Sequence, residues 1–497
     1  MRRLKGIWIF GILTLALACG DEVDIYNPLT PGQTDFTNTE PGNNGYSYGY
    51  PESDSANKGG ATGASPQTPA PGAPPQGRTG EVEEADIYKV DKDRLFYLNT
   101  YRGFMIYDMK DPKDPKLISR LPVYGYPIEM FIKDNTVYAL IRDALYLTQE
   151  KGKFQFKRHN VSQLVAIDIS DLTKPQVLQT VDITGQLREG VSRKIDDTIY
   201  VVSYITRYYY PSWSYYGGSN PQQKEQAWVY SFNVKDPKKL QVIQKMKVFE
   251  GGGYSNSTTG ASESRYFSSV TISATSNMLM VVENWRRYGY SSGDKYNCST
   301  YQSLQEAVVT LVDISDPKGY INTWSRFTTY GELGDQFKQT YIYDKKTGKA
   351  TYLGIFARRE WLSSNCSGTS FIENALESWD ITNGAKPVRQ DTLSFGKKNE
   401  TVRGSVFDPD RRVAFAITAR NIDPLYALSF ADPKALKITS LVDNLSGDMN
   451  VFKFVENKKF LVAIGRDNTK ACDGFANNNS GWSTGVAVSL IDVQDLT

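Results

Sequence analysis

Glu84 and Asp86 are the residues of this 497-residue chain whose spacing most directly suggests chemistry. They alternate within a short segment that we expect to be a β-strand, so both carboxylates should point to one side, which in a ring of sheets would be the central channel. Two such carboxylates could bind calcium or act as general acid and general base. The alternative is structural, because residues of this kind often hydrogen-bond to the ends of neighbouring strands.

The chain has a single histidine, His159, in the polar segment FKRHNVS. Histidine is the commonest general base and the commonest metal ligand, so a histidine-rich metal site is excluded. Any Ser-His-Asp or Cys-His centre would have to be built on His159, which we interpret as a solvated loop residue. The sequence therefore predicts no catalytic residue, no metal site and no cofactor, and it leans against an enzyme.

Three cysteines lie in the long segments between expected strands: Cys298, Cys366 and Cys472. Cys298 and Cys366 fall in neighbouring repeats, which makes them the best disulfide candidate in an oxidising compartment. Cys472 is then left over, and it either pairs with a cysteine beyond Thr497 or stays a free thiol. The spacing of the three fits no zinc pattern.

Two long segments are rich in aromatic residues: RYYYPSWSYYGG at residues 207–218 and NWRRYGYSSGDKY at residues 284–296. Exposed Tyr, Trp and Arg provide broad contact area for a protein or a sugar. The alternative is that these side chains pack on one another and hold long loops rigid. The candidate binding residues are Tyr208, Tyr209, Tyr210, Trp213, Tyr215, Tyr216, Trp285, Arg286, Arg287 and Tyr288.

A repeat indicates the elements that must position these residues. A strand ending in an Asp-Pro-like turn recurs seven times, beginning at Met105, Val165, Tyr230, Thr310, Glu377, Tyr426 and Val488. Each copy lies within the same order of four short strands, and no helical periodicity interrupts them. Four-stranded antiparallel units that recur in this way predict a β-propeller. A β-sandwich is the second choice, but it does not predict such a repeat.

The repeat predicts about seven units, of which the last is incomplete because the sequence stops at Thr497 before a fourth strand. We therefore expect a propeller over residues 81–497 that is truncated at its carboxyl end. Turns between first and second strands and between third and fourth strands are short. The segments on the other face are long, and loops freed from packing often carry binding function. These long segments are residues 142–163, 206–226, 250–264, 284–306, 358–374 and 466–485.

The segment EVEEADIYKVDKDRLFYL at residues 81–98 resembles the opening of secreted bacterial and archaeal proteins with a carboxyl-terminal β-propeller distantly related to WD repeats. GYPIEMFIKDNTVYALI from Gly125 and RNIDPLYALSFADPK from Arg420 are similar to the same family, so the resemblance covers most of residues 80–495. It implies a propeller with further strands after residue 497, with an eighth blade as one alternative. The function of that family is not established, so the resemblance implies no activity.

The first residues predict export. Basic residues precede an apolar run from Ile7 to Ala18, which is too short for the roughly 20 residues that span a bilayer. We interpret residues 1–18 as a signal peptide and Cys19 as a lipidated amino terminus, with Gly20 favouring the outer membrane. Ordinary cleavage after Ala18 is the alternative. Residues 19–80 are rich in Pro, Gly, Ser and Asn and predict a disordered tether with a span on the order of 40 Å.

These features predict an envelope-anchored lipoprotein whose partners are a membrane, through the lipid on Cys19, and an unknown protein or glycan. A net charge of +2 without a dense basic run argues against nucleic acid. We expect non-enzymatic binding or scaffolding through the long loops of one face. The alternative is a hydrolase of envelope or extracellular polymers that uses Glu84 and Asp86.

Overall fold

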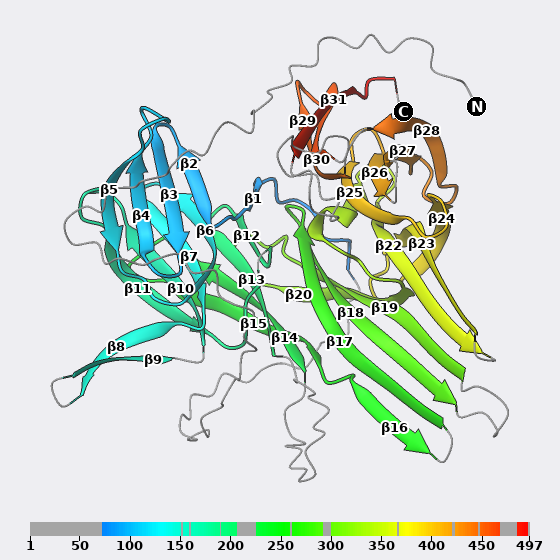
Figure 1. The fold of residues 1–497 in the computed structure, drawn as a ribbon, viewed down its shortest axis with the longest axis horizontal. Coiled ribbons are helices and arrows are strands. Elements are labelled where there is room, and N and C mark those ends of the chain that lie inside the picture. The colour runs from blue at the N-terminus through cyan, green and yellow to red at the C-terminus, as the bar shows by residue number, and fades with distance from the viewer. Residues whose placement is uncertain are drawn as a thin grey trace, which may run out of the picture.

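Antiparallel β-strands are the main secondary structure of the described residues in this computed structural model, and Figure 1 shows their sheets following one another around a ring. This confirms the predicted all-β propeller. The structure describes residues 72–150, 153–158, 161–188, 190–205, 225–258, 261–291, 300–364, 367–419, 423–445, 448–467 and 485–495. Several predicted features lie outside these residues: the signal peptide, Cys19, the tether up to residue 71, His159, the aromatic residues from Tyr208 to Tyr216, Cys298, Cys366 and Cys472.

The first three sheets are separate from one another. The first contains β2 (Tyr88–Asp91), β3 (Arg94–Asn99), β4 (Gly103–Asp108) and β5 (Lys116–Leu121). The second contains β6 (Tyr126–Lys133), β7 (Thr136–Arg142), β10 (Ser162–Asp168) and β11 (Gln176–Ile183), beside a ribbon of β8 (Leu145–Glu150) and β9 (Lys153–Arg158). The third has the order β1 (Val82–Glu84), β12 (Ser192–Ile195), β13 (Thr198–Ile205), β14 (Gln226–Asn233) and β15 (Gln241–Glu250).

A nine-stranded sheet follows. It contains β16 (Tyr254–Thr258), β17 (Ala261–Ala274), β18 (Met278–Ser291), β19 (Thr300–Asp313), β20 (Asn322–Tyr330), β21 (Gln339–Asp344), β22 (Lys349–Ser364), β23 (Ser367–Asp380) and β24 (Val388–Phe395). A 3-10 helix, η1 (Gln336–Lys338), precedes β21. Within the described residues, no helix has the length and apolar character needed to cross a membrane.

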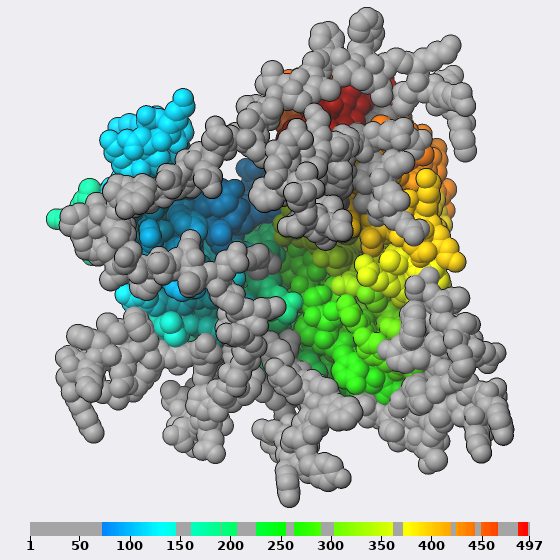
Figure 2. Space-filling model, in the orientation of Figure 1, coloured from blue at the N-terminus to red at the C-terminus, as the bar shows by residue number. Residues whose placement is uncertain are grey.

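Two smaller sheets follow toward the carboxyl end. One contains β25 (Thr401–Asp408), β26 (Val413–Ala419), β27 (Asp423–Ser429) and β28 (Lys437–Leu445). The other contains β29 (Asp448–Val455), β30 (Phe460–Asp467) and β31 (Gly485–Asp492). Figure 2 shows the first sheets, in blue and cyan, on the opposite side of the molecule from the orange and red segments near the carboxyl end.

The prediction of about seven separate blades is wrong, because the structure has five sheets of four or more strands. Two expected units are joined into the nine-stranded sheet. The join forms because β19 and β22 are long enough to pair beyond the ring, with Tyr301–Leu304 opposite Glu360–Ser363. The last sheet has three strands among the described residues.

The recurring Asp-Pro-like motif has one structural role in all its copies. The residue that ends the third strand accepts a hydrogen bond from the backbone N–H two residues later, at 2.8–3.3 Å. This bond fixes the turn to the fourth strand, as short polar side chains commonly do. The accepting residues are Asp108, Asp168, Asn233, Asp313, Asp380, Ser429 and Asp492.

Neighbouring repeats are connected by hydrogen bonds that we call turn clamps. In each one, a side chain on the fourth strand of a repeat forms a hydrogen bond with the backbone of a turn in the next repeat. The Gln179 side chain both accepts from Leu240 N–H at 2.6 Å and donates to its carbonyl at 3.3 Å. The other clamps join Ser119 to Leu172, Gln244 to Ile321, Trp324 to Ile381 and Asp391 to Leu436. Each clamp satisfies backbone groups that packing would otherwise leave unpaired.

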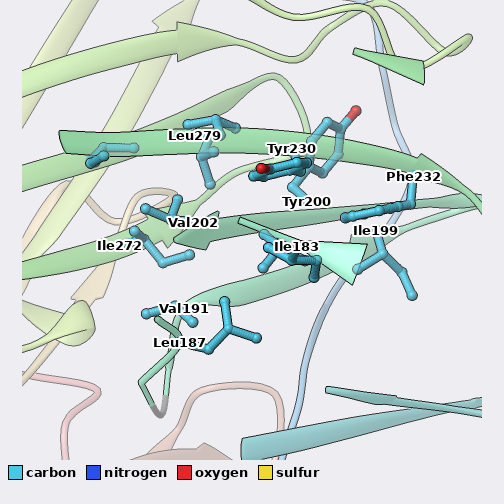
Figure 3. Close-up of a cluster of buried hydrophobic side chains, with 14 of the residues drawn as sticks. Ile183, Leu187, Val191, Ile199, Tyr200, Val202, Tyr230, Phe232, Ile272 and Leu279 are labelled. Carbon is cyan, nitrogen blue, oxygen red and sulfur yellow. The ribbon is translucent and has the colours of Figure 1, made fainter. Parts of the chain in front are cut away.

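The core lies between adjacent sheets rather than within a single layer. β13 is buried along most of its length because sheets pack on both of its faces, which explains its nearly continuous apolar sequence TIYVVSYI. Figure 3 shows part of the largest cluster, where Val202 of β13 lies next to Ile272 of β17 and Leu279 of β18. Burial of these side chains, at about 25 cal/mol per Å² of apolar surface, is the main stabilising contribution.

One face of the last sheet is apolar and exposed. Val486, Val488 and Leu490 alternate along β31 and are 74, 65 and 64% exposed. The register places Ile464 opposite Val488 and Val451 opposite Ile464, so these side chains share one face. The opposite face packs on the neighbouring sheet through Ile491.

Candidate functional site

The first candidate site is a polar cluster at the inner strands, which we call the central polar cluster: Glu84, Glu129, Ser192, Arg193 and Gln336. Glu84 lies on β1, which pairs with β12 in the middle of the molecule (Figure 1). Arg193 of β12 forms an ion pair with Glu84 at 3.6 Å and donates to Gln336 Oε1 at 2.5 Å. Gln336 also donates to Glu84 at 3.5 Å. The arrangement ties β1 to β12 and to η1.

Glu129, on β6, is only 2% exposed. Its carboxylate accepts hydrogen bonds from the backbone N–H groups of Gly190 and Val191 and from the Ser192 hydroxyl. Burial raises the pKa of Glu129 above its ordinary value, against the opposing effects of the Ser192 bond and the Arg193 charge. Burial also lowers the pKa of Arg193, which the charges of Glu84 and Glu129 oppose.

Glu84 and Asp86 have different hydrogen-bond partners. Glu84 is held by Arg193 and Gln336, whereas an Asp86 carboxylate oxygen accepts from the N–H of Ile87 at 2.7 Å, and the Asp86 backbone bridges to Met130 of β6. Each carboxylate therefore has a partner in the strands. In the described parts of the chain, no group of three His, Cys, Asp or Glu residues is placed to hold a metal ion.

The second candidate site is formed by segments predicted to be long loops. That prediction is wrong for residues 250–264, 284–306 and 358–374, because most of their described residues continue strands β16–β19, β22 and β23. Part of residues 142–163 forms the β8–β9 ribbon. Figure 1 shows the green and yellow strands extending well beyond the other sheets. We call the described residues among 254–265, 284–291, 300–306, 358–364 and 367–373 the projecting sheet.

Strand geometry divides the predicted binding residues of β18 between two faces. Trp285 is 2% exposed and packs against Phe249 and Phe267, so its predicted exposure in a loop is wrong. Arg286, the next residue, points the other way and is exposed. Alternation along a strand explains this difference between adjacent residues.

The two remaining predicted residues of β18 make side-chain contacts within the sheet. Arg287 forms an ion pair with Glu263 of β17 at 2.6 Å. The Tyr288 ring lies 5.9 Å from the ring of Tyr266 in a tilted arrangement. The projecting sheet thus presents Arg286 together with a Tyr266–Tyr288 pair on one face, held by β-strand pairing rather than by a loop.

The third candidate site is a cavity of about 430 Å³, which we call the Phe371 pocket, beside β23 and β24. A smaller cavity of about 150 Å³ lies near Lys338 and Glu332. Sequence reasoning missed both. The available signal was the pair of lysines directly after β24, which resembles an ordinary polar turn. The Phe371 pocket is lined by Phe371, Ile372, Glu373, Ser394, Phe395, Gly396, Lys397 and Lys398.

Comparison with solved structures gives weak likenesses. A candidate 6-phosphogluconolactonase of Bacteroides fragilis is 12% identical, with 79% of this chain and 94% of that chain covered and a TM-score of 0.33. A candidate 6-phosphogluconolactonase of Bacteroides uniformis is 11% identical, with 76% of this chain and 90% of that chain covered and a TM-score of 0.31. The Cps50 (Swd1) β-propeller domain of Myceliophteria thermophila is 8% identical, with 84% of this chain and 98% of that chain covered and a TM-score of 0.31. These values carry no argument about function.

No curated protein matches the chain. A family model described as the beta propeller domain does match, over residues 78–256 and 390–497, which is more than half of the sequence. The two matched segments contain all of the first three sheets and the last two. On this match and the ring of antiparallel sheets, the chain belongs to the beta propeller domain family.

Proposed function

We propose that this protein is an exported, lipid-anchored propeller that binds a protein or glycan partner through the projecting sheet, without catalysis. The observation that carries the proposal is the extension of β17–β19, β22 and β23 beyond the ring, where strands of 14 to 16 residues replace the turns expected of a minimal propeller. Strands hold binding side chains in fixed positions more accurately than loops do.

The chemistry of the projecting sheet supports binding. Arg286 is exposed beside a pair of tyrosine rings, and Arg and Tyr are among the residues that contribute most at interfaces. On the other face, Arg287 and Tyr254 both bond to Glu263, at 2.6 and 2.7 Å, and so stiffen the sheet. The contacts of Glu84 with Arg193 and Gln336, and of Asp86 with the Ile87 N–H, favour a structural role for both carboxylates over hydrolysis.

The sequence supports the anchored, exported state through the basic and apolar residues before Cys19 and the tether that follows. Expression of the full chain in a bacterium tests it: detergent phase partitioning and mass spectrometry of the amino terminus should detect acylated Cys19. Cys19→Ser should move the protein to the aqueous phase, whereas Cys472→Ser should not. A wild-type amino terminus without lipid would contradict the anchor.

Binding is tested with the purified full chain, an array of bacterial glycans and covalent cross-linking to envelope proteins. Arg286→Glu should reduce capture of the identified partner at least about tenfold. The matched control is Arg102→Glu, an exposed arginine in a turn of the first sheet, which should leave capture unchanged. Equal loss in both variants, or no loss in either, would contradict the projecting sheet as the binding surface.

A further inference from the structure

The Phe371 pocket lies where the projecting sheet meets the ring. Phe371 and Glu373 come from β23, Ser394 and Phe395 end β24, and residues 396–398 begin the connection to β25. Its volume of about 430 Å³ is within the range of small-ligand sites. The pocket therefore continues the surface on which the proposed function depends.

Hydrogen bonds fix the walls of the pocket. Asn399 N–H donates to the Ile372 carbonyl at 3.0 Å, and Ile372 N–H donates back to the Asn399 side chain at 3.1 Å. Glu400 is 5% exposed, and its carboxylate accepts from Lys397 N–H at 2.9 Å and from the Thr418 hydroxyl at 2.7 Å. A connection held at both ends in this way is preformed, which lowers the entropic cost of binding.

The pocket is lined by apolar, positively charged and negatively charged side chains. The Phe371 ring is an apolar wall, and the Lys398 ammonium lies 5.6 Å from its centre. Lys397 is exposed beside it. Glu373 accepts a hydrogen bond from the Ser394 hydroxyl at 2.5 Å and has Arg358 at 3.6 Å, which offsets its charge. The pocket thus combines two lysines, two phenylalanines and one carboxylate that is paired with Arg358.

We infer that the Phe371 pocket binds a carboxylated sugar residue, an inference that rests on the proposed binding function and names its ligand class. The two ammonium groups match one ligand carboxylate. The C–H surface of a sugar ring packs against Phe371, and sugar hydroxyls donate to Glu373 or hydrogen-bond with Ser394. A neutral sugar would have no anionic group to pair with the two lysines. An inorganic phosphate ion could contact the two lysines, but it has no C–H surface to pack against Phe371.

The test is titration of the full chain with methyl β-D-glucuronide, followed by saturation-transfer NMR and calorimetry. Methyl β-D-glucoside has the same ring without the carboxylate and should bind at least about tenfold more weakly. The double variant Lys397→Gln with Lys398→Gln should lose glucuronide binding by a similar factor. Lys434→Gln with Lys437→Gln, on two exposed residues at the turn before β28 and at the start of that strand, is the control and should bind as the wild type does.

Equal binding of glucoside and glucuronide, or full binding by the Lys397 and Lys398 double variant, would overturn the inference. So would equal competition by inorganic phosphate, which would indicate a nonspecific anion site. Tighter binding of a glucuronate oligosaccharide indicates a polymer as the source, and equal binding indicates a free sugar acid; both support the inference. If glucuronide fails to bind while Arg286→Glu still abolishes partner capture, this inference fails and the proposed function stands.

Discussion

The Arg78 guanidinium donates a hydrogen bond of 2.6 Å to the Tyr200 hydroxyl, joining the segment before β1 to the third sheet. The same side chain reaches the carbonyls of Ile195 and Ile314 at 2.7 and 3.1 Å and pairs with Asp196 at 3.1 Å. One arginine therefore connects the amino-terminal segment to two sheets. Arg78 is 6% exposed, so water cannot readily replace these partners.

We predict that Arg78→Met lowers the free energy of unfolding by about 2–4 kcal/mol, because it leaves buried oxygen atoms without donors. Urea denaturation measures the change, and hydrogen exchange of Val82–Glu84 should show faster opening of β1. Arg102→Met, on an exposed side chain, should change stability by less than about 0.5 kcal/mol. Equal effects of the two substitutions would contradict the role of Arg78.

Asp408 should make stability depend on acid pH. Its side chain is fully buried and pairs with Arg411 at 2.7 Å and Lys458 at 3.0 Å, which links β25 to the turn between β29 and β30. Burial alone would raise the Asp408 pKa, but the bonds from Arg411 and Lys458 outweigh it and hold the pKa below its ordinary value of 3.8. The stabilisation is therefore present above pH 3.8 and is lost as pH falls through the lowered folded-state pKa.

We predict that Asp408→Asn destabilises the protein by about 1–3 kcal/mol at pH 7 and that this difference shrinks below pH 3.8. Urea denaturation at several pH values measures both. Asp410→Asn is the matched control, because Asp410 also pairs with Lys458 but is 82% exposed. Asp410→Asn should lower the free energy of unfolding by less than about 1 kcal/mol. A difference for Asp408→Asn that is constant from pH 7 to pH 3 would argue against the lowered pKa.

The Gln179 turn clamp should contribute measurably to stability. We predict that Gln179→Ala lowers the free energy of unfolding by about 1–2 kcal/mol, because the part-buried Leu240 N–H loses its hydrogen-bond acceptor. Gln163→Ala removes an exposed bond to Asp182 in the same sheet and should cost much less. Thermal unfolding of the two variants compares them directly. A smaller loss for Gln179→Ala than for Gln163→Ala would be inconsistent with the clamp.

Trp285 and Arg286 are neighbours with opposite environments and should respond differently to truncation. We predict that Trp285→Ala destabilises by about 3–5 kcal/mol, because it removes a side chain packed on Phe249 and Phe267. Arg286→Ala should change stability by less than about 0.5 kcal/mol. Chemical denaturation distinguishes them, and similar losses would show that the strand alternation described here is wrong.

The repeat could be predicted from the sequence because its turn carries a local signal. Asp168 accepts from a backbone N–H only two residues later, so the same residue types recur wherever the same turn forms. The propeller and the positions of most strands follow from that recurrence. The joining of two units into one sheet could not be predicted, because it depends on pairing of residues near Tyr301 with residues near Glu360.

The candidate sites were less predictable for physical reasons. The projecting strands carry polar and aromatic residues on both faces, so the apolar alternation that identifies a half-buried strand is missing around Arg286. Arg193 lies in the segment GVSRKIDD, where nothing marks a buried guanidinium. Its partners, Glu84 and Gln336, come from distant parts of the chain and only the fold brings them together.

The turn clamps all run in the same direction along the chain. In each one the clamping side chain belongs to the earlier repeat and the clamped backbone to the later one, as with Gln244 and Ile321 or Asp391 and Leu436. Local opening of one repeat therefore frees the turn of its successor but leaves the turn of its predecessor held. Damage to an early sheet should spread toward the carboxyl end, so a substitution near β5 should loosen more of the molecule than the same substitution near β24.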